Sequence, residues 1–175
     1  MNQDTIRELT QLWFVSEKYF ELALSEKDRI PQAALKWTVK ILADKCKEQS
    51  ELSRNKNLIY FVAHLNSCAV RLYSIEENLR SDRWVRYDTL KKCKDEGKIR
   101  HEIEQNLAVY IHFLLRHMVA HSESERARHK NKKFRIAFDA MYDIFFALDF
   151  DSILKSTDVL IGSIKNDLTT LGIRL

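Results

Sequence analysis

The sequence predicts an all-α fold, a single-domain helical bundle of about five to seven helices that spans residues 1–175. Only 3 glycines and 1 proline occur in 175 residues, too few of the turn residues that a sandwich or barrel of many short strands requires. Apolar residues recur at intervals of three and four along most of the chain, which is the helical period. No internal repeat or long linker divides the chain, so we expect one domain.

The first two predicted helices lie before residue 57. The first covers residues 6–24 and begins at a capping-box spacing, because Glu8 follows three residues after Thr5. The second begins at Pro31, whose missing N–H costs nothing in a first turn, and continues to residue 46 before a polar run.

The next two predicted helices are separated by a short polar break. Residues 58–79 show the clearest alternation by three and four in the chain. Ser81 and Asp82 interrupt that pattern and are typical of the start of a helix, which we expect over residues 84–90, with Gly97 closing it.

Three further helices are predicted in the second half of the chain. The first runs from about residue 99 to residue 120, and the next covers residues 133–148. On one side the first carries Leu107, Tyr110, Ile111, Leu114 and Met118. Asp149 or Asp151 caps the last helix, which Gly172 ends.

Charge and composition point to an ordinary cytoplasmic protein. The net charge is +4, from 29 basic and 25 acidic residues, which is below the level where charge alone implies a nucleic-acid partner. No signal-peptide pattern is present, and no apolar stretch approaches the roughly 20 residues that span a bilayer. The 3 cysteines are an odd number and lie within apolar patterns, as reduced core thiols do. We therefore expect a cytoplasmic location and no membrane partner.

Several functional motifs are absent from the sequence. The isolated glycines cannot form a phosphate-binding loop, the cysteines lack CxxC spacing, and no Glu-x-x-His pair occurs. We therefore predict no cofactor and no metal site.

One constellation could carry chemistry, the run from Leu114 to Glu125 that contains Arg116, His117 and His121. On a regular helix each residue turns about 100°, so Arg116 projects roughly 140° away from His121. A single straight helix therefore does not bring these two side chains together. Either the helix unwinds where the following polar segment begins, or the site is shared with another helix or subunit.

Structural interpretations of the same residues remain open. A histidine that ends an apolar stripe also fits a partly buried residue bonded to a carbonyl, and Arg116 also fits a partner of a carboxylate. His117 and His121 have a legitimate two-ligand spacing on a helix, but zinc needs further ligands and the sequence names no obvious one.

Arg116-His117-x3-His121 resembles the R-x4-H motif of the HEPN superfamily, in which a polar residue commonly follows the arginine. The setting is also similar, because the motif falls on a late helix of a small all-α domain, with apolar residues before it and a polar segment after it. The abortive-infection and toxin-type members are nearest in character. The tyrosine that follows the histidine in one toxin branch is replaced here by Ser122 and Glu123, which argues against that branch.

The resemblance implies a metal-independent endoribonuclease in prokaryotic antiviral defence or toxin–antitoxin function, with RNA as substrate and an antitoxin or regulatory protein as partner. His121 would be the general acid/base, because an imidazole pKa lies near neutrality. Arg116 would hold the scissile phosphate, and His117 would orient or polarise the reacting groups. Family members generally form a homodimer whose cleft contains both copies of the motif, and 2′-OH attack would spare DNA.

Basic residues flank the predicted site on both sides. We expect an RNA-binding loop over residues 122–133, and a second basic group precedes the motif-bearing helix. The loop residues assigned to RNA binding are Arg126, Arg128, Lys130, Lys132 and Lys133. The second group is Lys91, Lys92, Lys94, Lys98 and Arg100. Both also fit solvated surface. Three aromatic residues could stack bases but are interpreted as core: Trp84, Tyr87 and Tyr110.

Two non-enzymatic functions compete with the ribonuclease. One is a non-catalytic helical-bundle protein that binds RNA or a partner protein, and the other is a regulatory bundle that docks protein alone. The first predicts damage from charge reversal in the basic loop but no turnover, and the second predicts no affinity for nucleic acid at low salt.

Overall fold

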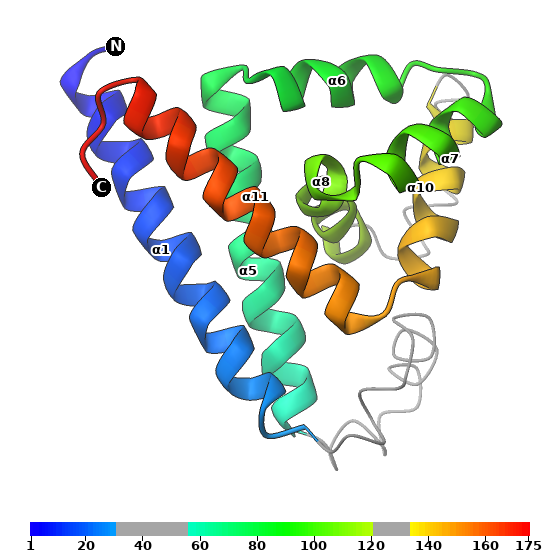
Figure 1. Ribbon diagram of the computed structural model, residues 1–175, viewed down its shortest axis with the longest axis horizontal. Coiled ribbons are helices and arrows are strands. Elements are labelled where there is room, and N and C mark those ends of the chain that lie inside the picture. The colour runs from blue at the N-terminus through cyan, green and yellow to red at the C-terminus, as the bar shows by residue number, and fades with distance from the viewer. Residues whose placement is uncertain (31–55, 121–133) are drawn as a thin grey trace.

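The computed structural model describes residues 1–30, 56–120 and 134–175. Within these ranges the chain is all-α, with seven helices packed together and no strand, which confirms the predicted fold class (Figure 1). The helices are α1 (Gln3–Lys27), α5 (Lys56–Leu79), α6 (Asp82–Leu90), α7 (Glu96–Gln105), α8 (Leu107–Ala120), α10 (Arg135–Ala147) and α11 (Phe150–Thr170). The helix expected after Pro31 lies outside the described residues.

The two longest helices, α1 and α5, lie side by side and antiparallel (Figure 1). The predicted capping box at the start of α1 is wrong, because the cap is Asn2. Its side-chain Oδ1 accepts a hydrogen bond from the backbone N–H of Thr5 at 2.7 Å. An asparagine at this position satisfies a donor that the first helical turn leaves without a partner.

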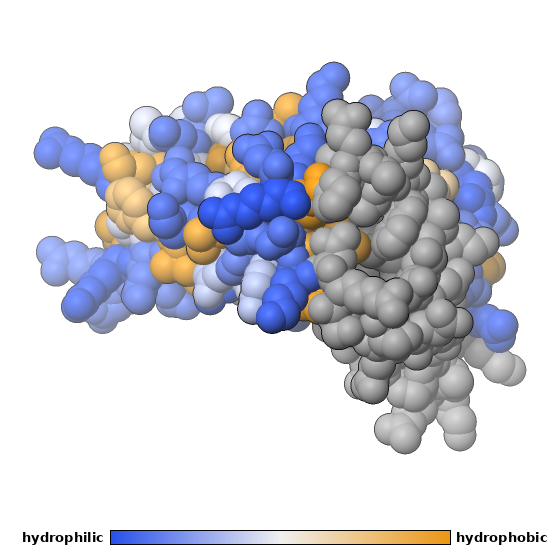
Figure 2. Space-filling model, turned by 90° about the horizontal axis from the view of Figure 1, so that it is seen from below, coloured by the Kyte–Doolittle hydropathy of each residue, from blue (hydrophilic) through white to orange (hydrophobic). Residues whose placement is uncertain are grey.

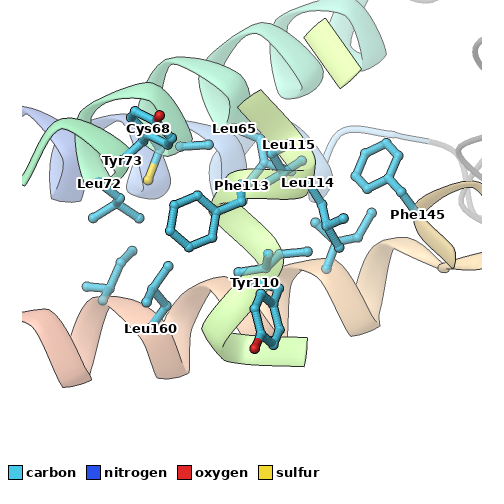
Figure 3. Close-up of a cluster of buried hydrophobic side chains, with 14 of the residues drawn as sticks. Leu65, Cys68, Leu72, Tyr73, Tyr110, Phe113, Leu114, Leu115, Phe145 and Leu160 are labelled. Carbon is cyan, nitrogen blue, oxygen red and sulfur yellow. The ribbon is translucent and has the colours of Figure 1, made fainter. Parts of the chain in front are cut away.

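The central element is α8, which contacts α5, α6, α7, α10 and α11. Every residue from Tyr110 to Leu115 is buried, so this stretch is covered on all sides rather than along one stripe as the period predicted. Figure 3 shows its side chains between those of α5 and Leu160 of α11. Arg116, the residue that follows this stretch, is therefore attached to a rigid base.

The helix predicted over residues 99–120 is two helices, α7 and α8, because the chain turns at Asn106. The Asn106 backbone has φ −132° and ψ 41°, and its N–H donates to the carbonyl of Ile103. Its side-chain Nδ2 donates to the carbonyl of Glu102 at 3.1 Å. Asparagine competes for backbone hydrogen bonds in this way, which disfavours a continuous helix.

The other helix ends follow the sequence closely, with one exception. Ser81 caps α6 by accepting a hydrogen bond from the N–H of Trp84 at 3.1 Å, and Asp149, not Asp151, caps α11. Gly172 follows α11 with φ +79°, as a helix-ending glycine does. The prediction for Gly97 is wrong, since α6 ends at residue 90 and Gly97 lies in the first turn of α7.

A buried ionic network joins α5, α6 and α11. The Glu76 carboxylate is 0% exposed and accepts hydrogen bonds from Arg83 Nε at 2.9 Å and Nη2 at 2.7 Å, and also from Ser81. Arg83 Nη1 donates to Ser163 Oγ at 2.7 Å, and Nη2 also pairs with Asp167. A charge can be buried here because it is paired and hydrogen-bonded.

By length and composition α5 could cross a membrane, contrary to the expectation that no stretch approaches that length. In the structure, however, 44% of the most apolar 18-residue stretch of α5 is buried inside the fold. The helices that pack against α5 include α1, α8 and α11. A core helix of a folded domain passes the same test, so the length and composition of α5 are weak evidence for a membrane span. On the face shown in Figure 2, polar and charged side chains predominate and apolar ones form small separate patches.

Candidate functional site

Arg116 lies in α8 directly after the buried run that ends at Leu115. Its side chain is half-buried, and its guanidinium lies over the ring of Tyr73 of α5, with 3.3 Å between Cζ and the ring centroid. An arginine over an aromatic face is held by the ring's negative potential. Arg116 therefore has a fixed position on the surface of the bundle.

Tyr73 belongs to a cluster of four buried aromatic rings from α5, α6 and α8, completed by Trp84, Tyr87 and Phe113. Tyr73 meets Trp84 at 5.1 Å and Phe113 at 5.5 Å between centroids, both edge to face. The rings of Tyr87 and Phe113 stack at 3.8 Å. Trp84 and Tyr87 are thus core residues, as is Tyr110 at 1% exposure, which confirms the interpretation of all three as core. Figure 3 shows Tyr73 and Phe113 facing one another from α5 and α8.

Cationic side chains cover the outer side of this aromatic cluster. Arg80 Cζ lies 5.4 Å from the Trp84 ring centroid, and Lys91 Nζ lies 5.5 Å from that of Tyr87. Lys91 is paired with Asp88 at 2.6 Å. In contrast, no carboxylate of the described chain forms an ion pair with Arg80 or Arg116. Among the described residues, these two arginines therefore have no salt-bridge partner, and they lie beside the same pair of rings.

The charges around Tyr73 act on its phenol. Burial raises the pKa of Tyr73, and the nearby Arg116 guanidinium opposes that rise by favouring the phenolate. Glu77 raises the pKa further, while Arg80 lowers it. The net pKa lies above the ordinary value, so Tyr73 remains a neutral hydrogen-bonding group near neutrality.

The structure describes only part of the predicted site. Arg116 is placed as above, and His117 follows it within the helical backbone of α8. His112, one turn before Arg116, is buried with its ring 3.8 Å from that of Phe113. The predicted acid/base His121 lies outside the described residues, and so does the predicted RNA-binding loop. The loop residues concerned are Arg126, Arg128, Lys130, Lys132 and Lys133.

The basic group that precedes α8 is largely neutralised by neighbouring carboxylates. Lys91 and Lys92 both pair with Asp88, and Arg100 lies 2.8 Å from both Glu96 and Asp143. Lys98 pairs with Asp95 at 3.8 Å. Hydrogen bonds from Lys91 and Lys92 lower the pKa of Asp88 to about 2. This pattern favours the interpretation of these residues as solvated surface over a phosphate-binding face.

No group of three or more metal-ligating side chains occurs among residues 1–30, 56–116 and 134–175. Cys68 is fully buried, and burial raises the pKa of its thiol to about 12. A thiol with so high a pKa is neither a nucleophile nor a metal ligand near neutrality.

Sequence reasoning missed Tyr73 and Arg80 as neighbours of Arg116. In the sequence, Tyr73 is one more apolar position of its helix, and Arg80 is a charged residue at a helix end. No spacing in the sequence relates either residue to position 116, because packing of α5 and α6 against α8 brings them together.

The fold and site define an all-α protein built around a helix whose buried stretch is followed directly by an arginine. Comparison with protein-family models, with curated proteins and with solved structures gave no match.

Proposed function

We propose that the protein is a HEPN-like metal-independent endoribonuclease that acts as a homodimer in prokaryotic defence or toxin function. The observation that supports this best is the state of Arg116. It directly follows the buried stretch of α8, is held by Tyr73, and forms no ion pair with a described carboxylate. An arginine in that state has donors left for a phosphate, which is the task that the motif assigns to it.

In the proposed reaction, the ribose 2′-oxygen attacks the adjacent phosphorus and the bond to the 5′-oxygen breaks. His121 takes the 2′-OH proton or gives a proton to the leaving 5′-oxygen. Arg116 binds the phosphate as negative charge develops on it, and His117 orients or polarises the reacting groups. The products are a 2′,3′-cyclic phosphate, which water can open to a 3′-phosphate, and a 5′-hydroxyl end.

A shared cleft accounts for the separation of the motif residues around the helix. The backbone of α8 is helical to Ala120, one residue before His121. One further regular step would leave Arg116 and His121 roughly 140° apart. A second copy of the chain, related by a two-fold axis, can supply the missing partner at each site.

The proposed setting is the cytoplasm, with RNA as the substrate. A ribonuclease used in defence needs restraint in an uninfected cell, which is the role proposed for an antitoxin or regulatory protein.

The test is RNA cleavage in EDTA by the purified protein and by an Arg116→Ala/His121→Ala double variant. A mixed RNA pool is the substrate, and a DNA pool should remain intact because it lacks the 2′-OH. The matched control is Arg7→Ala/His101→Ala, since both residues are exposed and lie on other helices. We expect cleavage by the wild type and the control, and none by the motif variant. Equal cleavage by the motif variant would contradict the proposed site.

The second candidate function is a non-catalytic bundle that binds RNA or a partner protein. The contact of Arg116 with Tyr73 favours it, because an arginine that packs 3.3 Å from a ring centroid has a structural use without any reaction. Here Arg116→Ala lowers stability, and the folded dimeric wild type shows no turnover in the same assay.

A further inference from the structure

We propose that Arg80 and Arg116 form one two-arginine binding site for the RNA backbone, in which Arg80 holds a phosphate beside the one that Arg116 clamps. This inference deepens the proposed function and rests on it for the identity of the ligand. It adds a binding residue that lies outside the R-x4-H motif.

Geometry relates the two arginines through a pair of touching rings. Arg116 covers Tyr73, Arg80 covers Trp84, and the two ring centroids are 5.1 Å apart. The arginines come from different places in the fold, because Arg116 is on α8 and Arg80 is the first residue after α5. The aromatic pair therefore sets the spacing of two cations that the sequence keeps far apart.

The contacts with the rings leave most of the hydrogen-bond donors of the two arginines available, because the Tyr73 phenol takes a hydrogen bond from Arg116 and no described carboxylate takes one from either arginine. A guanidinium carries five N–H donors, so one hydrogen bond to a phenol and a contact with a ring leave several of them for another ligand. Those donors match two oxygens of a phosphate. By contrast, the nearby Arg83 pairs with Glu76 and Asp167, and Arg86 pairs with Glu102.

Local charge also favours an anion at this place. No described carboxylate pairs with either arginine, although Glu77 lies close enough to act on the Tyr73 phenol. Two cations beside one ring pair repel each other, and a bound phosphate relieves that repulsion. An RNA backbone presents such phosphates in succession.

The backbone at Arg80 gives a second indication. Its φ of +51° lies in the left-handed region, at the position after a helix where glycine is preferred. An arginine at this position carries a backbone cost that glycine would avoid, and a binding role for its side chain gives a reason for that cost.

The test measures binding apart from cleavage, with a fluorescently labelled 2′-O-methyl oligouridylate that cannot be cut because its 2′-oxygen carries a methyl group. Anisotropy titrations over a range of salt concentrations compare the wild type with Arg80→Gln and Arg116→Gln. The matched control is Arg71→Gln. Arg71 also covers a ring, that of Tyr19 at 4.6 Å, and lies about 160° around α5 from Tyr73.

We expect Arg80→Gln and Arg116→Gln each to weaken binding about tenfold, and each to reduce the slope of log K against log salt by roughly 0.7. Arg80→Lys should restore the salt slope, and Arg71→Gln should match the wild type. Thermal unfolding of each variant checks that it is folded.

The outcomes separate this inference from the proposed function. If Arg80→Gln binds like Arg71→Gln while the wild type still cleaves RNA, the two-arginine site is wrong and the ribonuclease stands. If binding depends on Arg80 and Arg116 but no RNA is cleaved, the ribonuclease is wrong and the site belongs to an RNA-binding bundle. If the wild type does not bind the oligonucleotide at low salt, the two-arginine site is overturned.

Discussion

Replacing Arg83 with methionine tests how strongly the buried ionic network holds α5, α6 and α11 together. The substitution keeps a long side chain but removes the guanidinium. Glu76, which is 0% exposed, then loses hydrogen bonds of 2.9 and 2.7 Å and its only cationic partner among the described residues. It keeps the hydrogen bond from Ser81.

The expected cost follows from leaving a buried charge uncompensated. Removing one partner of a buried pair typically costs about 3–5 kcal/mol of unfolding free energy. A domain of this size has about 5–15 kcal/mol in total, and each kcal/mol lowers Tm by about 2–4 °C. Arg83→Met should therefore lower Tm by roughly 10 °C. Asp167→Asn should cost no more than about 1 kcal/mol, because the Asp167 side chain is 44% exposed.

Urea unfolding followed by circular dichroism at the helix band measures these differences. Together with the two single variants, the double variant Glu76→Gln/Arg83→Met completes a thermodynamic cycle. It also removes the Glu76 charge that Arg83→Met leaves buried without a cationic partner. We expect the double variant to recover most of the loss. A cost below about 1 kcal/mol for Arg83→Met, or a double variant whose cost equals the sum of the single costs, would refute the reasoning.

Three further predictions follow from the same structure. Iodoacetamide at pH 8 should label the half-exposed Cys93 in the native protein and Cys68 only after unfolding, because burial raises the Cys68 pKa to about 12. Peptide mass spectrometry measures the labelling, and equal rates for Cys68 and Cys93 in the native protein would contradict the prediction. Burial also raises the pKa values of Tyr87 and Tyr110, so these groups stay protonated in the folded state after they ionise in the unfolded chain. Stability should then be retained below about pH 9 and fall above it, by up to about 1.4 kcal/mol per pH unit for each group; a urea midpoint that stays constant from pH 8 to pH 10.5 would be inconsistent with that coupling. Arg80→Gly should be more stable than Arg80→Ala by about 1 kcal/mol, because both lose the contact with Trp84 but only glycine relieves the positive φ; equal unfolding midpoints would show that the backbone there is not strained.

Local signals in the sequence predicted most of the described helices. Ser81 and Asp149 are short polar residues placed before apolar periods, and each caps the helix that follows it. The break at Asn106 was missed because the apolar period continues through it. The side-chain bond from Asn106 to the Glu102 carbonyl does not mark a break by itself, since Asn78 makes the same bond within α5. The burial of α8 on all sides was missed for a related reason, since periodicity records one apolar face and not the number of neighbours.

The candidate site divides in the same way. The sequence alone determined that the protein is all-α and that Arg116 falls near the end of an apolar helix, because helical period, capping residues and a short motif are local properties of the chain. Only the tertiary structure decided that Arg116 meets Tyr73, that Arg80 covers the neighbouring Trp84, and that Glu76 is buried against Arg83. These contacts join residues of different helices, and their geometry depends on how α5, α6 and α8 pack, which no local pattern encodes.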